Sequence, residues 1–439
     1  MDNCINILKI FMKRTILLLF VGLSACHPSK KINENASIDE LAKKYVQLGL
    51  TIGAYDADFV DAYYGPPALK QQVSKGLVFP KDSLLQAVEK LKFSFTEAVN
   101  SNHNEATTKR INYLIAQLTA FRERIEIFSG NTLSFDEEAT SLFGVTPPHF
   151  PDSHYHSLAA QLNNILPGNG PIPERLKLLT ARFVIPRDKI DTVFKTAISE
   201  ARRRTKTYYD LPSTENFALE YVTNKPWSGY NWYKGNYQSL IQINTEGPIY
   251  IERAIDLACH EGYPGHHVYN MLLEQNLYKA KGWVEISMYP LFSPQSFIAE
   301  GSANYGIELA FPGKEKNIYL KNVLLPLAGL DTTGIDAYLQ ALEIMRKLNY
   351  ARNEVAAAFL NKQINEDEAL THLSDLGVMS VESAKKSLRF IKFYRSYVIN
   401  YNYGRDLIAN YIEHSSATEA DRWKKFYFLL SNPVTPKDL

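Results

Sequence analysis

The chain has 439 residues and a net charge of +1, with 45% hydrophobic and 22% charged residues. This composition is typical of a globular protein with a large buried core, and the near-neutral charge gives no basis for nucleic-acid binding. The chain has 27 tyrosines and 22 phenylalanines, which suit a well-filled core or a wide amphipathic cleft.

The first residues are typical of a secreted bacterial precursor. Lys13 and Arg14 precede the apolar run ILLLFVGL, which is too short to span a bilayer. The next residues, LSAC, resemble a lipobox, in which the cysteine becomes the lipidated first residue of the mature chain. We predict a lipoprotein signal over 1–25, a polar tether over 26–36 and a membrane anchor at Cys26. The expected location is the cell envelope, facing the periplasm or the cell surface; a plain signal peptide is the alternative.

The body is predicted to be mainly α-helical. Ser37 and Glu40 form a capping-box pattern at the start of a first helix. Apolar residues then recur at helical spacing in 83–100, 105–129, 154–166 and 188–209, and again in 334–361, 365–375, 380–399, 405–414 and 416–430. Asn365 and Ser416 are the expected N-caps of two of the later helices.

One segment of the middle of the chain predicts a small β-sheet. Residues 226–250 are rich in aromatic and β-branched residues, and YQSLIQIN (237–244) alternates as a strand does. WVEISMY (283–289) is a second candidate strand. No linker divides the body, so we expect a helical N-terminal half (37–220) and a catalytic half (221–439) within one integrated domain, 37–439.

Residues 260–267, HEGYPGHH, interrupt an amphipathic helical pattern. The zinc-protease signature His-Glu-x-x-His places two histidines four residues apart on one helix face, whereas here Pro264 holds the fourth position. Proline costs about 3 kcal/mol inside a helix, so a segment that only filled a core would gain from alanine there. A Pro-Gly bulge with two extra residues would move His266 to the second ligand position. We therefore predict His260 and His266 as zinc ligands, with His267 as the rival, and Glu261 as the general base.

Zinc in a hydrolase needs a third protein ligand and an open position. Glu300 is the best candidate, because it sits in the otherwise apolar stretch SFIAEGSANYG and a buried carboxylate needs a partner. Asn304, one turn later, is expected to hold a ligand histidine in place, and Glu308 is the alternative third ligand. Cys259 is expected to be a small buried residue.

Three other histidines, His149, His154 and His156, are expected to be surface residues or satisfied core residues. Tyr401, Tyr403 and Arg405 are candidate donors to an oxyanion. Among them, Tyr401 is the preferred catalytic residue.

HEGYPGHH, preceded by INTEGPIY and followed by FIAEGSANYG, resembles the bacterial domain-of-unknown-function 885 family. These are lipoproteins thought to be related to helical, gluzincin-type zinc peptidases. The resemblance implies a large helical metallopeptidase-like fold, with a small sheet beside the zinc-binding helix and a central cleft. It implies His260 and His266 as ligands, Glu261 as base and Glu300 as third ligand.

The resemblance also extends to other residues. Tyr305 matches a family tyrosine, and YNYG (401–404) matches the last family element, while Ser302 stands where the family usually has tryptophan. In related peptidases a strand before the zinc helix pairs with the substrate backbone, so Gln242 and Asn244 are expected along the cleft.

The predicted function is that of a zinc peptidase with one Zn²⁺ per chain, acting on a peptide or small amide substrate. Zinc would activate a water molecule whose proton Glu261 takes and passes to the leaving amine. A zinc amidase or esterase acting on a non-peptide or cell-wall substrate is one alternative. A zinc-containing binding lipoprotein without activity is another, although such a protein has no need of Glu261.

Overall fold

The computed structural model describes residues 34–70, 78–101, 104–225 and 227–439. The predicted signal peptide, the lipidation site Cys26 and most of the predicted tether lie outside these residues. Within the described residues, no helix is both long and apolar enough to cross a bilayer.

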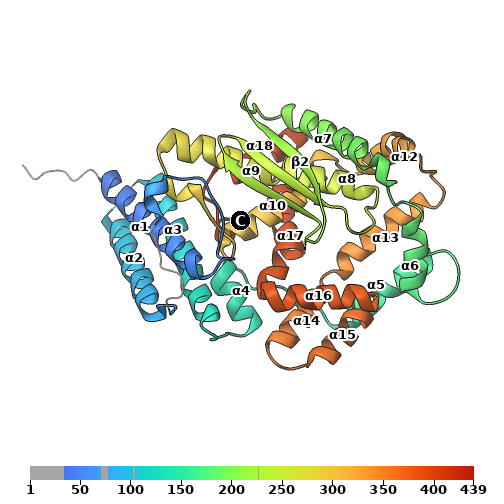
Figure 1. Cartoon of the computed structure of the whole chain (residues 1–439), viewed down its shortest axis with the longest axis horizontal. Helices are drawn as coiled ribbons and strands as arrows, with labels where there is room; N and C mark the ends of the chain where they lie inside the picture. The colour runs from blue at the N-terminus through green and yellow to red at the C-terminus, as the bar shows by residue number, and fades with distance from the viewer. Residues whose placement is uncertain (1–33, 71–77, 102–103, 226) are drawn as a thin grey trace, which may run out of the picture.

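The described residues are mainly helical, as predicted, and contain two small sheets where one was expected (Figure 1). The helices of the first half are α1 (Glu34–Tyr55), α2 (Lys81–Ser101), α3 (Glu105–Phe128), α4 (Phe135–Phe143), α5 (Asp152–Ile165), α6 (Ile172–Ala181) and α7 (Ile190–Lys206). Those around the centre are α8 (Glu252–Leu257), α9 (His266–Leu273) and α10 (Pro294–Ala310). The later helices are α11 (Glu315–Tyr319), α12 (Leu325–Ala328), α13 (Ile335–Leu348), α14 (Ala351–Leu360), α15 (Glu366–Asp375), α16 (Val381–Tyr394), α17 (Ile399–Glu413) and α18 (Glu419–Ser431).

The larger sheet contains β2 (Asn216–Val222), β3 (Gly229–Gly235) and β4 (Gln238–Asn244), in the order β2-β4-β3. β4 lies in the middle, parallel to β2 and antiparallel to β3. A second sheet joins β1 (Val60–Tyr63) to β5 (Met288–Pro290), antiparallel, and so links the N-terminal helices to the centre of the molecule. The predicted strand 237–244 is confirmed, while β1 and β2 were not predicted.

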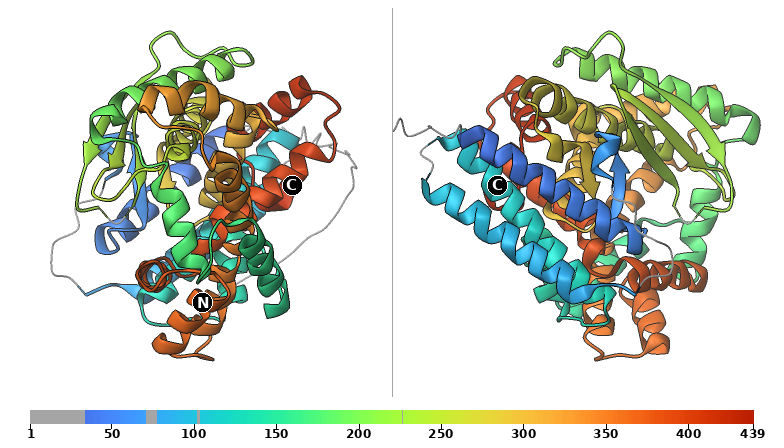
Figure 2. Two further views of the ribbon diagram at one scale, coloured as in Figure 1. Left: turned by 90° about the vertical axis from the view of Figure 1, so that its right-hand side faces the viewer. Right: turned by 60° about the vertical axis from the view of Figure 1, so that its left-hand side comes forward.

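Three hydrophobic clusters form the core. One lies between α1, α2 and α3, which pack side by side (Figure 2, right). A second joins α4 to α14, α15 and α16. The largest lies between the three-stranded sheet, the helices from α5 to α10, and the later helices α12, α13, α17 and α18. This largest cluster draws residues from both sides of position 220, so the core does not separate at the predicted division between the two halves.

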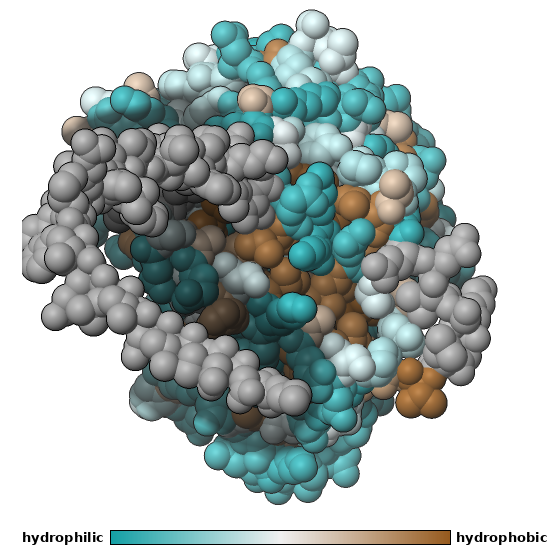
Figure 3. Space-filling view, turned by 90° about the vertical axis from the view of Figure 1, so that its left-hand side faces the viewer, coloured by the Kyte–Doolittle hydropathy of each residue, from teal (hydrophilic) through white to brown (hydrophobic). Residues whose placement is uncertain are grey.

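Figure 3 views the molecule from the side of the N-terminal helices. Apolar residues gather near the middle of this face, between hydrophilic ones (Figure 3). Phe93 on α2 and Phe128 at the end of α3 are among the exposed large apolar side chains of this part of the chain.

Several predicted boundaries were wrong. The first helix begins at Glu34, before Ser37. The predicted helix 334–361 is two helices, because α13 ends at Leu348 and α14 starts at Ala351. The predicted strand 283–289 is mostly a 3₁₀ turn, η5 (Val284–Ser287), followed by the short β5.

The last helix is capped by Thr418 rather than Ser416, since Thr418 and Asp421 form the reciprocal capping-box bonds. Asn365 and Glu368 form the predicted capping box of α15.

Candidate metal centre

The interrupted helix supplies two histidines through a local change of winding. After α8 the chain makes a π-helical turn, η3 (Ala258–Gly262), whose amide–carbonyl bonds span five residues instead of four. The chain is then extended at Tyr263, and α9 starts at His266. The predicted Pro-Gly bulge is therefore a π turn followed by a break in the helix. These two features together place His266 beside His260, with ring centroids 4.7 Å apart.

Gly265 makes this return possible. Its N–H donates to the carbonyl of Cys259 at 2.9 Å. A Cβ atom at this position would lie 2.0 Å from the carbonyl oxygen of His260, a distance that no side chain tolerates. Only glycine therefore fits between the end of the π turn and the start of α9.

Helix α10 brings a carboxylate to the two histidines. His260 Nε2 lies 3.2 Å from His266 Nε2 and 3.3 Å from Glu300 Oε2, and His266 Nε2 lies 3.8 Å from the same oxygen. All three side chains are at most 15% exposed. A tetrahedral zinc site with metal–ligand distances of about 2.0–2.1 Å separates its ligand atoms by about 3.3 Å. The three atoms are thus spaced for one metal ion.

The hydrogen bonds around the cluster use the other polar atoms of His260 and Glu300, so that the three atoms face one another. Glu300 Oε1 accepts a hydrogen bond from the Tyr397 hydroxyl at 2.9 Å, while Glu300 Oε2 is buried without a hydrogen-bond partner among the described residues. His260 Nδ1 lies 3.0 Å from Asn304 Oδ1, and Asn304 Nδ2 donates to the carbonyl of Tyr401 at 2.9 Å. Because the Asn304 amide is oriented by that carbonyl, its oxygen faces His260 and selects the Nδ1–H tautomer, with the Nε2 lone pair directed at the cluster.

The electrostatics favour a cation at this point. Although burial opposes the charged form, the Glu300 carboxylate raises the pKa of His266 to about 9. Burial also opposes charge on Glu300, but the close approach of His260 and His266 holds its pKa well below the usual range. Two imidazoles and one carboxylate form a donor set suited to zinc, so the residues present fit this metal.

The rival His267 points elsewhere. It is fully buried, with Nδ1 2.9 Å from Ser239 Oγ and Nε2 3.1 Å from Glu215 Oε2. Both ring nitrogens are therefore engaged between α9 and the sheet, and His267 is not available to the cluster. Ser239, His267 and Glu215 contact one another in series, as the residues of a nucleophilic triad do. All three are at most 5% exposed, however, so they are part of the packed core.

A cleft of about 1260 Å³ opens beside the cluster. Glu261, Asn304, Tyr401 and Arg405 line it, as do the three cluster residues. Glu261 follows His260 directly in the π turn, and its side chain fits because residue 229 is glycine: a Cβ there would lie 3.1 Å from Glu261 Oε1. The general-base candidate thus lines the same cleft as the three cluster residues.

Other predicted residues lie away from the cluster. Tyr305 does not line the cleft, because its hydroxyl donates to Glu413 at 2.6 Å. The alternative ligand Glu308 pairs with Arg405 and is not part of the cluster. Cys259 is a free, buried thiol whose pKa is raised by burial, as expected of a packing residue.

The expectation that Asn244 and Gln242 lie along the cleft was wrong. Both belong to β4, the middle strand, whose two edges are already paired, and neither lines the cleft. Asn244 Nδ2 instead donates to the carbonyls of Lys225 and Trp227. The strand that faces the cleft is β3, the edge strand, through Gly229 to Asn231.

Several residues that line the cleft were not predicted from the sequence, and Tyr397 and Asp61 are two of them. Tyr397 precedes Tyr401 by four residues, a helical spacing that places both near Glu300 and that was present in the sequence. Asp61 enters the cleft from β1, hydrogen-bonded to the Tyr230 hydroxyl, and burial raises its pKa to about 6. No local pattern connects Asp61 to a site about two hundred positions later.

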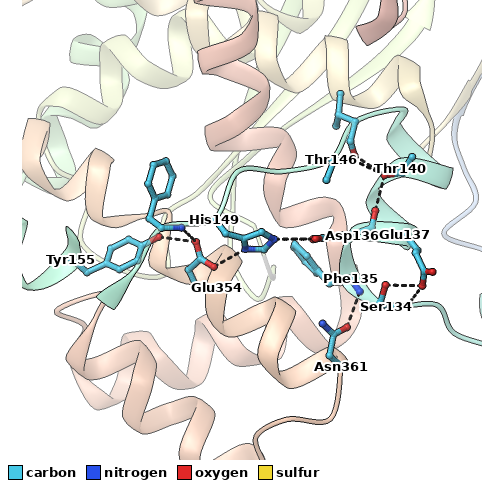
Figure 4. Close-up of polar contacts among 12 residues, drawn as sticks. Ser134, Phe135, Asp136, Glu137, Thr140, Thr146, His149, Tyr155, Glu354 and Asn361 are labelled. Atoms are coloured by element: carbon cyan, nitrogen blue, oxygen red, sulfur yellow. Dashed lines mark hydrogen bonds and ion pairs between the residues drawn. The ribbon is translucent and has the colours of Figure 1, made fainter. Parts of the chain in front are cut away.

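The other histidines take up structural roles. His149 bridges two helices: Nδ1 lies 2.8 Å from Glu354 of α14 and Nε2 lies 3.0 Å from Asp136 of α4 (Figure 4). His156 pairs with Asp375 at 3.3 Å, and His154 stacks on Phe150. None of the three belongs to the metal cluster.

No family model and no curated protein matches this chain. A solved structure described as "the putative lipoprotein from Colwellia psychrerythraea" aligns with a TM-score of 0.49 and 16% identity, covering 82% of this chain and 68% of that one. Another, "a putative lipoprotein of unknown function from Shewanella oneidensis", aligns with a TM-score of 0.45 and 13% identity, covering 80% and 72%. At this level of similarity, neither structure informs the activity of this chain.

Proposed function

We propose that this protein is a zinc-dependent hydrolase, and specifically a peptidase with a metallopeptidase-like fold. The observation that carries the proposal is the spacing of His260 Nε2, His266 Nε2 and Glu300 Oε2, with Glu261 beside them in an open cleft. A binding protein has no use for the Glu261 carboxylate at this position, whereas a hydrolase needs a base there.

Each side chain of the centre would have its own role in the reaction. His260, His266 and Glu300 would hold the metal, with Asn304 and Tyr397 fixing the orientation of His260 and Glu300. Bound zinc would polarise a substrate carbonyl and lower the pKa of a water molecule. Glu261 would accept the proton of the attacking water and deliver it to the leaving amine.

Tyr401 is the proposed donor to the developing oxyanion. It lines the cleft, and burial, together with the charge of Glu300, raises its pKa well above the usual value, so its hydroxyl keeps its proton at neutral pH. A protonated hydroxyl at this place can donate a hydrogen bond to a negatively charged oxygen.

We also propose that the protein is lipid-anchored in the bacterial cell envelope. This rests on the LSAC sequence ending at Cys26. Metabolic labelling with a palmitate analogue tests it: wild type should carry the label and Cys26→Ser should not. Label retained by Cys26→Ser would contradict lipidation at this cysteine.

Metal analysis tests the centre itself. Purified wild type should hold about one zinc per chain, and His266→Ala should lose it. His267→Ala is the matched control, because the neighbouring histidine bonds to Ser239 and Glu215 instead. Retention of zinc by His266→Ala together with its loss from folded His267→Ala would contradict the assigned ligands.

A peptide-library digest tests the reaction. Wild type should cleave peptides, while Glu261→Gln should keep its zinc and lose activity by about 10²-fold or more. If zinc-loaded wild type cleaves no peptide but hydrolyses an ester or a cell-wall amide in a Glu261-dependent way, the protein is a hydrolase of another bond. If it hydrolyses none of these, the enzyme proposal fails.

A further inference from the structure

One wall of the cleft carries a cation without a carboxylate partner. Six lysine and arginine residues line the cleft, and five of them have a carboxylate within 4.0 Å; these five are Arg253, Lys316, Arg346, Lys386 and Arg405. The sixth, Arg352 on α14, has no ion pair and no side-chain hydrogen bond with any residue that the structure describes.

Arg352 is also partly buried. Its Nε atom is inaccessible to solvent and has no hydrogen-bond partner, and the loss of hydration lowers the pKa of its guanidinium. Arginine remains protonated in proteins, so this position holds a partly buried positive charge that has no counter-ion among the described residues. Buried charges are normally paired, and an unpaired one beside a cleft indicates that the partner arrives with a ligand.

A second unsatisfied donor lies on the same wall. Ser387 of α16 lines the cleft, is 5% exposed, and its hydroxyl has no partner among the described residues. Phe390 follows it by three residues, on the same face of α16, and the guanidinium of Arg352 lies 5.8 Å from the Phe390 ring centroid. A guanidinium and a hydroxyl that line the same cleft are donors suited to binding a carboxylate.

Aromatic rings connect this wall to the metal cluster. The Phe390 ring lies 6.0 Å from Tyr401, and Tyr401 lies 5.8 Å from Tyr397, which donates to Glu300. All of these residues line the cleft. An extended peptide advances about 3.3–3.6 Å per residue, so a carboxylate on Arg352 would sit within a few residues of the bond at the metal.

We propose that Arg352, with Ser387, binds a carboxylate of the substrate and so positions the peptide in the cleft. This rests on the proposed hydrolase function and deepens it, because the cleft then selects peptides by an anionic group. The carboxylate has two sources, a free C-terminus or an acidic side chain. A free C-terminus would make the protein an exopeptidase that acts near the end of its substrate.

The test compares three sets of peptides that wild type cleaves. The first set has neutral side chains and a free C-terminus, and the second has the same sequences with a C-terminal amide. The third has a C-terminal amide and one glutamate. Arg352→Gln should lower kcat/KM for carboxylate-bearing peptides by about 30-fold or more, mainly through KM, since breaking a buried charge pair costs that much. Ser387→Ala should give a smaller loss, and Arg352→Lys should recover part of the activity. Zinc content should stay at the wild-type level.

Arg346→Gln is the matched control, because that arginine lines the same cleft but is paired with Asp406 at 3.5 Å. It should change kcat/KM no more than about threefold. A loss in Arg352→Gln confined to free C-termini identifies the C-terminal carboxylate, and one confined to the glutamate peptides identifies the side chain. An equal loss on neutral amides, or no loss, overturns the proposal.

Direct binding separates this inference from the proposed function. The tripeptide Ala-Ala-Phe and its C-terminal amide are titrated calorimetrically into zinc-loaded Glu261→Gln, with and without Arg352→Gln. Tighter binding of the free acid that disappears in the double variant supports the Arg352 site even if no hydrolysis is found. Equal affinity for both ligands, or no binding of the free acid, counts against it.

Discussion

At the residue scale, Asn304 decides which nitrogen of His260 faces the cluster. The Asn304 side chain is fixed by the Tyr401 carbonyl and in turn faces His260 Nδ1 at 3.0 Å. Asn304→Ala removes this orientation without touching a ligand, so zinc affinity should fall by about 10- to 100-fold. A chelator competition titration measures the change.

Asn270→Ala is the matched control for Asn304. Asn270 also lines the cleft, but its side chain donates to the backbone carbonyl of His266 within α9. Its loss should leave zinc affinity within about threefold of wild type, as expected where no ligand side chain is oriented. Equal effects of the two variants would show that Asn304 does not act through His260.

Glu215 gives the protein a specific sensitivity to acid. Burial opposes its charge, but hydrogen bonds from His267, Tyr263 and Arg202 lower its pKa to about 2. Since the folded-state pKa lies below the usual 4.5, the ionised carboxylate contributes stability above pH 4.5, and this is lost as the pH falls towards 2. Urea unfolding between pH 7 and pH 3 should therefore show a smaller acid-dependent loss in Glu215→Gln, which is also less stable at pH 7. Parallel pH profiles of variant and wild type would contradict this.

At the element scale, the break between α8 and α9 depends on glycine. Gly265→Ala should destabilise the fold by about 3 kcal/mol or more and reduce zinc binding, because the new methyl group collides with two backbone carbonyls. Gly247→Ala is the control, since a Cβ there meets nothing within 4 Å. Thermal unfolding and zinc content measure both variants, and a Gly265→Ala protein as stable as Gly247→Ala would refute the close contact.

The break between α8 and α9 was predicted from the sequence only in part. Pro264 and Gly265 predicted that the helix fails and that His266 moves towards His260, because both residues act on the local backbone. The π turn before them was not predictable, since it depends on amide–carbonyl bonds that no residue type specifies. The choice between His266 and His267 depended on Glu215 and Ser239, which come from other parts of the chain.

The order of the strands in the larger sheet was also not predictable from the sequence. The alternation in YQSLIQIN predicted β4 correctly, but an alternating pattern does not tell a central strand from an edge strand. The cleft was therefore assigned to Asn244 when the edge strand β3 faces it. Pairing partners such as β1 and β5 lie too far apart in the chain for local patterns to reveal.

At the scale of the whole molecule, buried ion pairs attach the N-terminal helices to the body. Arg110 of α3 binds both carboxylate oxygens of Glu285 in η5, at 2.6 and 2.9 Å, and also pairs with Asp39 of α1. The Arg110 and Glu285 side chains are 6% and 1% exposed. This contact holds α1 and α3 against the segment leading to β5, whose partner strand β1 carries Asp61 into the cleft.

Removing one partner of this pair should be costly, and removing both less so. Arg110→Met leaves Glu285 buried without a counter-ion, so the free energy of unfolding should fall by about 3–5 kcal/mol, whereas adding Glu285→Leu should restore much of the loss. Lys109→Met on the same helix is the control: its pair with Glu105 is exposed, and the expected change is below about 0.5 kcal/mol. Urea unfolding of wild type, Arg110→Met, Glu285→Leu, the double variant and Lys109→Met measures the coupling. Additive losses in the double variant would mean that Arg110 stabilises the contact through its stacking on Trp283, 4.7 Å from the ring centroid, and not through the charge of Glu285.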